Sequence, residues 1–66
     1  MAKIQLNGKK ITLKKKTSVK ELLSKYKLLN KRVALELNGK IIPLAEYKMI
    51  LKDKDIVEIV HFIGGG

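Results

Sequence analysis

The groups best suited to chemistry in this sequence are its last three residues, Gly64, Gly65 and Gly66. Glycine lacks a Cβ atom and samples a wide range of backbone conformations, so a triglycine segment is thin and adaptable. Such a segment can carry a terminal α-carboxylate into a channel that is too narrow for side chains. The alternative is a frayed chain end, because disorder concentrates at termini. The choice between the two interpretations depends on the elements that precede the glycines.

Most other chemistry is disfavoured by composition. The sequence has 66 residues, no cysteine and one histidine, His61. It therefore offers no disulfide, no thiolate nucleophile and no cluster of metal ligands. A domain of this size has little room for a pocket lined by convergent polar groups. These features favour a carrier or binding module over an autonomous enzyme, with no bound metal or cofactor.

The positive charge suggests nucleic-acid binding as a rival function. The formal net charge is +9, and residues 1–32 hold eleven Lys or Arg against one acid. However, Arg32 is the one arginine, and the three aromatic residues (Tyr26, Tyr47 and Phe62) are scattered. Phosphate and base recognition depends on arginine, and single-strand binding depends on stacked aromatics. We therefore interpret the lysines as a solvated face and expect no nucleic-acid partner.

No apolar run approaches the roughly 20 residues that are needed to span a bilayer. The first residues also lack the apolar segment of a signal peptide. The sequence predicts a cytoplasmic protein without a membrane partner, monomeric when free.

Two alternating apolar segments at the start predict a β-hairpin. Ile4 and Leu6 precede Asn7-Gly8, and Ile11 and Leu13 follow it. Asn-Gly between alternating apolar residues is the strongest short-range hairpin signal.

A helix is expected next, over residues 19–28. Ser18 and Glu21 fit a capping box, with Thr17 as the alternative cap. Asn30 is expected to end the helix in the left-handed conformation. Apolar residues at helical spacing fall on one face of this helix: Val19, Leu22, Leu23 and Tyr26.

The second half predicts three more strands. Residues 33–37 alternate, Asn38-Gly39 supplies a second turn, and residues 41–42 form a short strand that Pro43 ends. Residues 44–51 should form a loop with a single helical turn at 45–47. A turn at 53–55 then leads to the last strand, 56–62.

This order of elements predicts an α+β fold, the ubiquitin-like β-grasp. We expect a mixed sheet of four to five strands with one helix packed across one face, and with the first and last strands adjacent and parallel at its centre. Residues 1–63 would form a single domain, and residues 64–66 a flexible tail.

With these elements in this order and the terminal glycines, the sequence resembles the ubiquitin-like sulfur carriers, and in particular the thiamine-biosynthesis sulfur carriers of the ThiS family. Segments 4–8, 18–23, 33–43 and 55–66 carry the resemblance, which covers nearly the whole chain. The small subunit of molybdopterin synthase is usually longer and tends to have prolines before its glycines, whereas this chain has His61-Phe62-Ile63. Two positions depart from the family pattern. Leu44 replaces a basic residue after the proline, and Asp53-Lys54-Asp55 replaces Asp-Gly-Asp, which implies a slightly strained or differently typed turn.

The resemblance implies that the chain is a cosubstrate and not an enzyme. A partner adenylyltransferase would use ATP and Mg²⁺ to adenylate the carboxylate of Gly66. A persulfide sulfur would then displace AMP, and the resulting thiocarboxylate would supply sulfur to thiazole synthase. Gly64 and Gly65 would thread the tail. The same chemistry could serve another acceptor (molybdopterin or transfer RNA) or a protein modifier, because the partner chooses the acceptor.

The last strand also suggests a docking surface. If Val57 and Ile59 face the helix, Val60 and Phe62 point outward beside the tail. We expect Phe62 and Val60, with Glu58 and Ile63, to bind the partners, although Phe62 could instead cover the rim of the core. His61 is expected to be half-buried without a catalytic role, and Glu58 to pair with a lysine.

Overall fold

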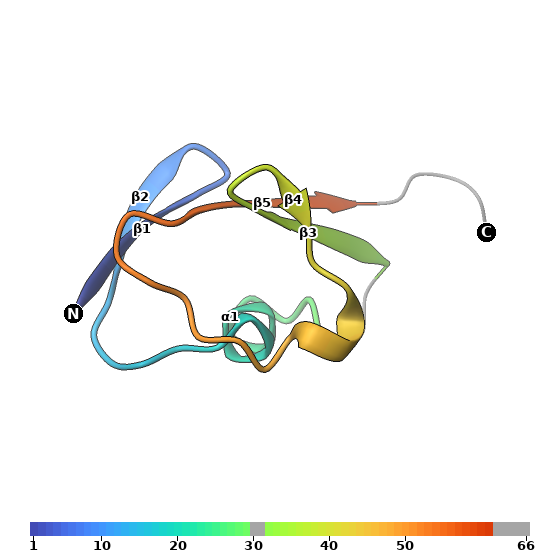
Figure 1. Cartoon of the computed structure of the whole chain (residues 1–66), viewed down its shortest axis with the longest axis horizontal. Helices are drawn as coiled ribbons and strands as arrows, with labels where there is room; N and C mark the ends of the chain where they lie inside the picture. Colours follow the sequence, from blue (N-terminus) through green and yellow to red (C-terminus); the bar gives the residue numbers. More distant parts are fainter. Residues whose placement is uncertain (30–31, 62–66) are drawn as a thin grey trace.

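The structure, a computed structural model, describes residues 1–29 and 32–61. Within them, two strands precede a helix, and two further strands and a single 3₁₀ turn precede the last strand (Figure 1). The elements are β1 (Ala2–Leu6), β2 (Lys9–Leu13), α1 (Val19–Lys25), β3 (Val33–Leu37), β4 (Lys40–Ile41), η1 (Leu44–Glu46) and β5 (Ile56–His61).

The strands form one sheet in the order β2-β1-β5-β3-β4. β1 and β5 pair in parallel at its centre, and the other neighbours pair in antiparallel fashion. Helix α1 and η1 lie on one side of the sheet, and the described residues leave the other side uncovered (Figure 1). The predicted β-grasp architecture, with its parallel central pair, is confirmed.

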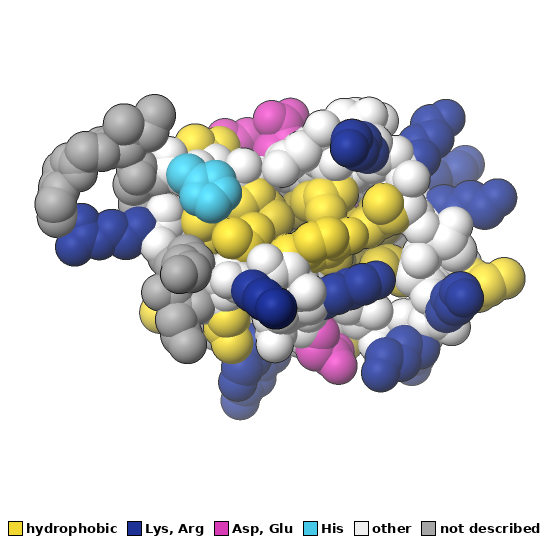
Figure 2. Space-filling model, turned by 180° about the vertical axis from the view of Figure 1, so that it is seen from behind, with side chains coloured by type: hydrophobic (Ala, Val, Ile, Leu, Met, Phe, Trp, Pro, Cys, Tyr) yellow, Lys and Arg dark blue, Asp and Glu magenta, His cyan; other side chains and the backbone are white. Residues whose placement is uncertain are grey.

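Ten buried apolar side chains fill the space between the sheet and the helix, and six of them leave at most 2% of their surface exposed: Ile4, Val19, Leu22, Leu23, Leu35 and Val57. Seen from behind, hydrophobic side chains gather in the middle of the surface, with lysine side chains beside them and toward the edges (Figure 2). Every described lysine is exposed, so none of them belongs to the core.

The two Asn-Gly turns have the backbone that type I′ hairpins require. Asn7 and Gly8 have φ of 48° and 86°, and Asn38 and Gly39 have φ of 52° and 87°. Both asparagine side chains also bind β5. The Oδ1 of Asn7 accepts a 2.8 Å hydrogen bond from the Ile59 N–H, and the Oδ1 of Asn38 accepts one of 2.8 Å from the Ile56 N–H. The turns therefore hold β5 from both sides.

The Asn7 bond is needed because β1 pairs with β5 only at Gln5 and Leu6. After Leu6, the Asn7 side chain provides the acceptor for the Ile59 N–H that a backbone carbonyl of a longer β1 would otherwise provide. We expect Asn7→Gly to lower the free energy of unfolding by about 1–2 kcal/mol, because glycine keeps the positive φ and leaves the Ile59 N–H unpaired. Urea denaturation measures the loss, and hydrogen exchange at Ile59 should accelerate. Unchanged stability would show that this bond contributes nothing.

The start of α1 has a partner for every free backbone N–H. The Ser18 N–H donates to the Glu21 carboxylate at 2.9 Å, and the Glu21 N–H donates to the Ser18 Oγ at 3.0 Å, so the capping box is confirmed. These bonds lower the pKa of Glu21, so the stability they add is lost as the pH falls through that lowered value. Carbonyls of the 47–49 loop accept from the next two N–H groups, those of Val19 and Lys20.

The predicted end of the helix is wrong by three residues. The helix ends at Lys25, and Lys27 adopts a left-handed φ of 60°, whereas Asn30 lies outside the described residues. The Leu28 N–H donates to the Leu23 carbonyl, and the Lys27 N–H donates to the Ser24 carbonyl, which together make a Schellman motif. Leu28 follows that motif and still packs against the core, as a residue of a further helical turn would. This is why the apolar pattern predicted a longer helix.

Two short elements are shifted by one residue from the prediction. β4 spans Lys40–Ile41 instead of residues 41–42, and the single turn η1 spans Leu44–Glu46 instead of 45–47. Pro43 has an extended backbone and stands as the N-cap of η1. The short strand therefore ends two residues before the proline, and the turn begins directly after it.

The turn before β5 is strained, as expected. Lys54 has φ of 72°, although a side chain disfavours this conformation. Neighbouring hydrogen bonds hold it there: the Asp53 carboxylate accepts from the Lys3 N–H at 2.8 Å, and the Lys54 N–H donates to the Lys3 carbonyl at 2.7 Å. The turn is thereby attached to β1.

Because of this φ, we expect Lys54→Gly to raise the free energy of unfolding by about 0.5–1 kcal/mol. Relief of the left-handed conformation exceeds the extra entropy that glycine gives the unfolded chain. Substitution by glycine is thus expected to lower the free energy of unfolding at position 7 and to raise it at position 54. A decrease at position 54 in urea denaturation would show that the lysine side chain stabilises the turn.

Candidate functional site

The structure tests only part of the predicted site. Glu58 and Val60 lie in β5, whereas Phe62, Ile63 and the three glycines lie outside the described residues. The alternative positions of Phe62, outward or over the core, therefore stay predictions, as does the boundary between domain and tail.

The segment that leads to the tail is a strand that is paired on both sides. β5 lies between β1 and β3, with five residue pairs to β3. Backbone N–H groups of Gln5 and Asn7 donate to the carbonyls of Asp55 and Val57, each at 2.9 Å. β5 thus ends at His61, at the opposite end of the molecule from Met1 (Figure 1). This paired strand is the last described element before the predicted tail.

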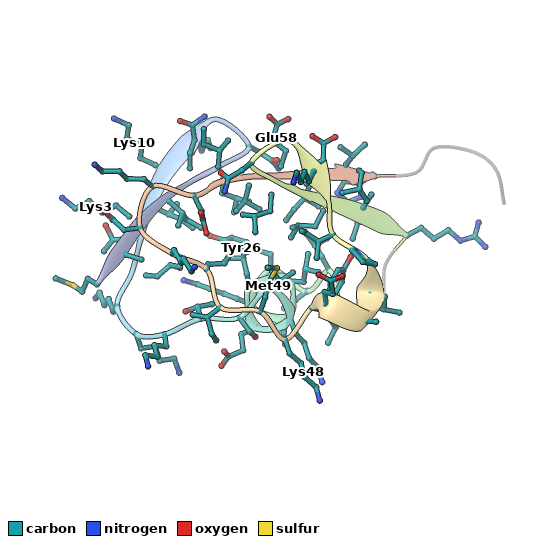
Figure 3. The ribbon with its side chains drawn as sticks, in the orientation of Figure 1. Lys3, Lys10, Tyr26, Lys48, Met49 and Glu58 are labelled. Atoms are coloured by element: carbon teal, nitrogen blue, oxygen red, sulfur yellow. The ribbon has the colours of Figure 1, made fainter. Side chains whose placement is uncertain are left out.

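Side chains of β5 alternate as predicted. Val57 and Ile59 are buried in the core, whereas Val60 is 46% exposed. Glu58 points away from the helix, on the uncovered side of the sheet (Figure 3). Strand register assigns the neighbours of Glu58 to this same side, which we call the open face: Ala34, Glu36, Ile41, Ile56, Glu58 and Val60.

The open face combines exposed apolar side chains with two carboxylates. Ile56, Val60 and Ile41 are all exposed large hydrophobics. The predicted lysine partner of Glu58 is wrong: no ion pair joins Glu58 to a described residue, and Glu58 lies directly opposite Glu36 of β3. Like charges at directly opposed positions weaken a sheet. The arrangement therefore does not serve stability.

His61 is exposed, and the predicted half-buried position is wrong. It shares the parity of Val57 and Ile59 but pairs with Val33, the first residue of β3, at the end of the sheet. Ile59 is the last buried residue of β5. The alternation therefore predicted the direction of the side chain but not the point at which the core ends.

The described part of the chain holds neither a metal-ligand cluster nor a membrane-spanning helix. Residues 1–29 and 32–61 contain no group of three or more His, Cys, Asp or Glu side chains that could hold a metal ion. Over the same residues, no helix has the length and apolar character to cross a bilayer.

Sequence reasoning missed part of the open face. It did not single out Ile56, although Ile56 shares the alternation of Glu58 in β5. It also missed Glu36 and Ile41, whose placement beside Glu58 depends on strand pairing. The alternation of Leu35 and Leu37 puts Glu36 on the outer side of β3, but the Glu36–Glu58 pairing follows only from the observed register. The alternation of residues along each strand shows which face of the sheet a side chain lies on. It does not determine which residues of neighbouring strands lie opposite one another.

Comparisons with known proteins give a consistent result. The sequence profile of the ThiS family matches residues 4–66. Sulfur carrier protein ThiS of Bacillus subtilis (strain 168) is 48% identical over 65 residues, which are 96% of this chain and 98% of that protein. The crystal structure of thiamine biosynthesis protein ThiS from Geobacter metallireducens superposes with a TM-score of 0.81, at 35% identity, and covers 97% of this chain and 99% of that one.

A thiazole synthase is also similar to this chain. That of Paramagnetospirillum magneticum (strain ATCC 700264 / AMB-1) is 35% identical over 65 residues, which are 97% of this chain but 20% of the synthase. A domain similar to this chain is thus part of a longer thiazole synthase sequence.

Proposed function

The chain belongs to the ThiS family, and on that premise we propose that it is the sulfur carrier of thiamine biosynthesis, acting through the carboxylate of Gly66. It is a carrier protein and not an enzyme. The observation that carries the proposal is the family match, which extends from β1 through the terminal glycines.

The reaction needs activation because a carboxylate is a poor acceptor for sulfur. A carboxylate oxygen of Gly66 attacks the α-phosphorus of ATP, a new P–O bond forms and pyrophosphate leaves. A persulfide sulfur then attacks the acyl carbon, the bond to AMP breaks, and a reductant cleaves the S–S bond to leave a thiocarboxylate. The partner adenylyltransferase supplies Mg²⁺ and the cationic groups that stabilise the phosphoryl transition state. The carrier contributes its terminus, and Gly64 and Gly65 give that terminus a thin stalk.

The partners are proposed to be an adenylyltransferase, a persulfide donor and thiazole synthase. Likeness to one fifth of a thiazole synthase supports the last of these, because joining a carrier domain to an enzyme favours partners that act together. A cytoplasmic location and a monomeric free state complete the proposal.

We assign docking to the open face and the residues that follow it. Ile56, Glu58 and Val60 lie on the strand that leads to the tail, so a partner that covers them also receives the carboxylate. Exposed apolar side chains on a rigid strand suit an interface, and Phe62 and Ile63 would extend this surface toward the glycines. Repulsion between Glu36 and Glu58 would be relieved by a cationic group of a partner.

Val60→Ser tests this docking surface. We expect about tenfold weaker binding to thiazole synthase, because an apolar contact is lost, and less than about 1 kcal/mol loss of stability. Isothermal titration calorimetry and urea denaturation give the two values. Ile50→Ser is the matched control, because Ile50 is 44% exposed against 46% for Val60 and lies beside the start of α1. Equal weakening by both variants would contradict docking at the open face.

The function itself is tested by the intact mass of the chain. The chain is incubated with a ThiS-family adenylyltransferase, Mg-ATP and a persulfide donor, and its mass is followed. The proposal predicts an AMP adduct and then exchange of one oxygen for sulfur at the C-terminus. An unchanged mass, with a partner that modifies the Bacillus subtilis carrier in parallel, would refute it.

A further inference from the structure

A second feature lies away from the open face. A cleft of about 660 Å³ separates the end of β2 from helix α1, within the size range of ligand sites. The β2–α1 connection that forms one wall lies at the opposite end of the molecule from the end of β5 (Figure 1). The cleft residues are Thr12, Leu13, Lys14, Lys15, Thr17, Glu21, Ser24 and Lys25.

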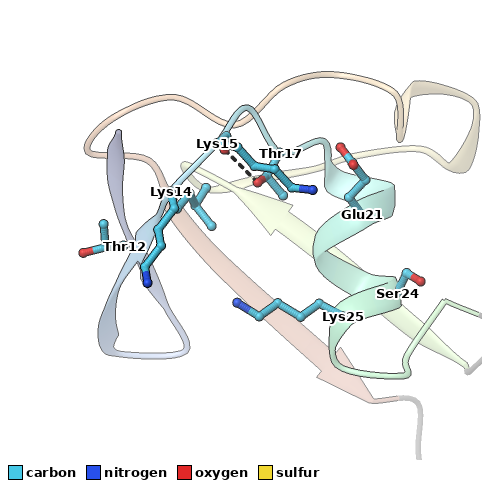
Figure 4. A pocket seen from close by; sticks show the side chains of 8 residues that line it. Thr12, Lys14, Lys15, Thr17, Glu21, Ser24 and Lys25 are labelled. Atoms are coloured by element: carbon cyan, nitrogen blue, oxygen red, sulfur yellow. Dashed lines mark hydrogen bonds between the residues drawn. The ribbon is translucent and has the colours of Figure 1, made fainter.

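Three lysines from two segments line this cleft. Lys14 and Lys15 lie in the β2–α1 connection, and Lys25 is the last residue of α1. The side chains of Lys14 and Lys25 extend into the gap from its two sides (Figure 4). No ion pair within the described part of the chain involves any of the three. A weak contact places the Lys25 Nζ 5.9 Å from the centre of the Tyr26 ring. Their positive charges are therefore available to a ligand.

The one carboxylate in the lining, that of Glu21, interacts electrostatically with Lys15. Glu21 also accepts the Ser18 N–H and is committed to the start of the helix. Its carboxylate points away from the gap between Lys14 and Lys25 (Figure 4). The ammonium groups of Lys14 and Lys25 are thus left without a carboxylate between them, and the cleft carries a local positive charge.

The chemistry of the lining indicates what would bind. Thr17 Oγ1 donates to the Lys15 carbonyl at 3.0 Å, and the hydroxyls of Thr12 and Ser24 point away from the gap (Figure 4). Recognition would therefore depend on charge and not on directed hydroxyl contacts. Lysine ammonium is a compact point charge and a common phosphate ligand. Grouped lysines favour an anion of high charge density over a single carboxylate.

We propose that the cleft between β2 and α1 binds phosphate groups, in a ligand that carries at least two of them. Lys14 and Lys25 hold the ligand from the two sides, and Lys15 adds charge at the rim. The source is either a small oligophosphate or a nucleic-acid backbone, because both present the same groups. Occupation leaves the open face and the end of β5 free, so the proposal is independent of sulfur transfer.

The test is a titration of the full chain with sodium pyrophosphate, followed by ¹H–¹⁵N NMR and matched by sodium chloride at equal ionic strength. Amide shifts should concentrate at residues 12–17 and 24–25 and be small in β5. Lys14→Gln/Lys25→Gln should weaken binding at least fivefold. The control, Lys40→Gln/Lys48→Gln, removes the same charge from exposed lysines outside the cleft and should change affinity less than twofold.

Equal weakening by the two double variants would overturn the proposal, because it would show that total charge and not the cleft binds the anion. Absence of shifts at the cleft would overturn it as well, as would a tetraglutamate peptide that binds the cleft as tightly as pyrophosphate. A single-stranded RNA oligonucleotide distinguishes the sources. RNA binding at the cleft that is at least tenfold tighter than pyrophosphate binding supports a polymer backbone, and comparable or weaker RNA binding supports a small oligophosphate.

Discussion

A chain with one alanine added after Gly66 is expected to acquire neither AMP nor sulfur. The addition moves the α-carboxylate by as much as about 3.5 Å and gives the terminal residue a Cβ atom. Reacting atoms must approach to about 3–3.5 Å in the correct orientation, and a displacement of about 1 Å already costs about a hundredfold in rate. Both mass changes should therefore fall below detection in the intact-mass experiment.

The matched control carries the same alanine before Met1. The N-terminus lies at the far end of the molecule from the end of β5 (Figure 1), so this variant should be modified at the rate of the unaltered chain. Adenylation of both variants at that rate would show that the reaction does not require the carboxylate to be that of Gly66. The family assignment would survive such a result, but the proposed role of Gly66 would not.

Leu35→Ala is expected to remove most of the stability of the domain. Leu35 has no exposed surface and lies in β3, opposite Ile59 of β5. Truncation of a buried leucine costs about 3–5 kcal/mol, because the cavity closes only in part. A domain of 66 residues has a total stability of about 3–10 kcal/mol. Urea denaturation should show a midpoint near zero or an unfolded chain at 25 °C.

Leu44→Ala provides the comparison. Leu44 is 74% exposed at the start of η1, so the same truncation should change the free energy of unfolding by less than about 0.5 kcal/mol. A small effect at Leu35 would mean that the space beneath β3 refills after truncation. Similar large effects at both positions would mean that Leu44 is buried in solution.

The parts of the fold that the sequence predicts well are those with local causes. Asn7-Gly8 and Asn38-Gly39 can adopt the positive φ that tight hairpin turns require, and strands with alternating apolar residues flank them. Both hairpins can therefore be predicted from neighbouring residues. The start of α1 follows from Ser18 and Glu21 for the same reason. Its end does not, because a lysine occupies the left-handed position where glycine or asparagine is usual.

Features that depend on distant segments could not be predicted in the same way. Carbonyls of the 47–49 loop satisfy the first N–H groups of α1, and Asn7 bonds across 52 positions to Ile59. Likewise, the pairing of Glu58 with Glu36 depends on the register between β3 and β5. For the site, the sequence indicated the direction of Val60 through parity. The sequence alone does not, however, show which residues of β3 and β4 belong to the open face.

The central pairing of β1 with β5 has a consequence for the synthesis of this protein. Gln5 and Ile56 are neighbours in the sheet, so β1, which is synthesised first, cannot pair with β5 until β5 has been synthesised. Contacts between such distant segments close slowly, and β1 and β3 keep unpaired edges until β5 arrives. A nascent chain therefore cannot complete its sheet before almost all of it has left the ribosome. Chains truncated before β5 should aggregate or be degraded, so a folded carrier includes the strand that leads to the C-terminal segment.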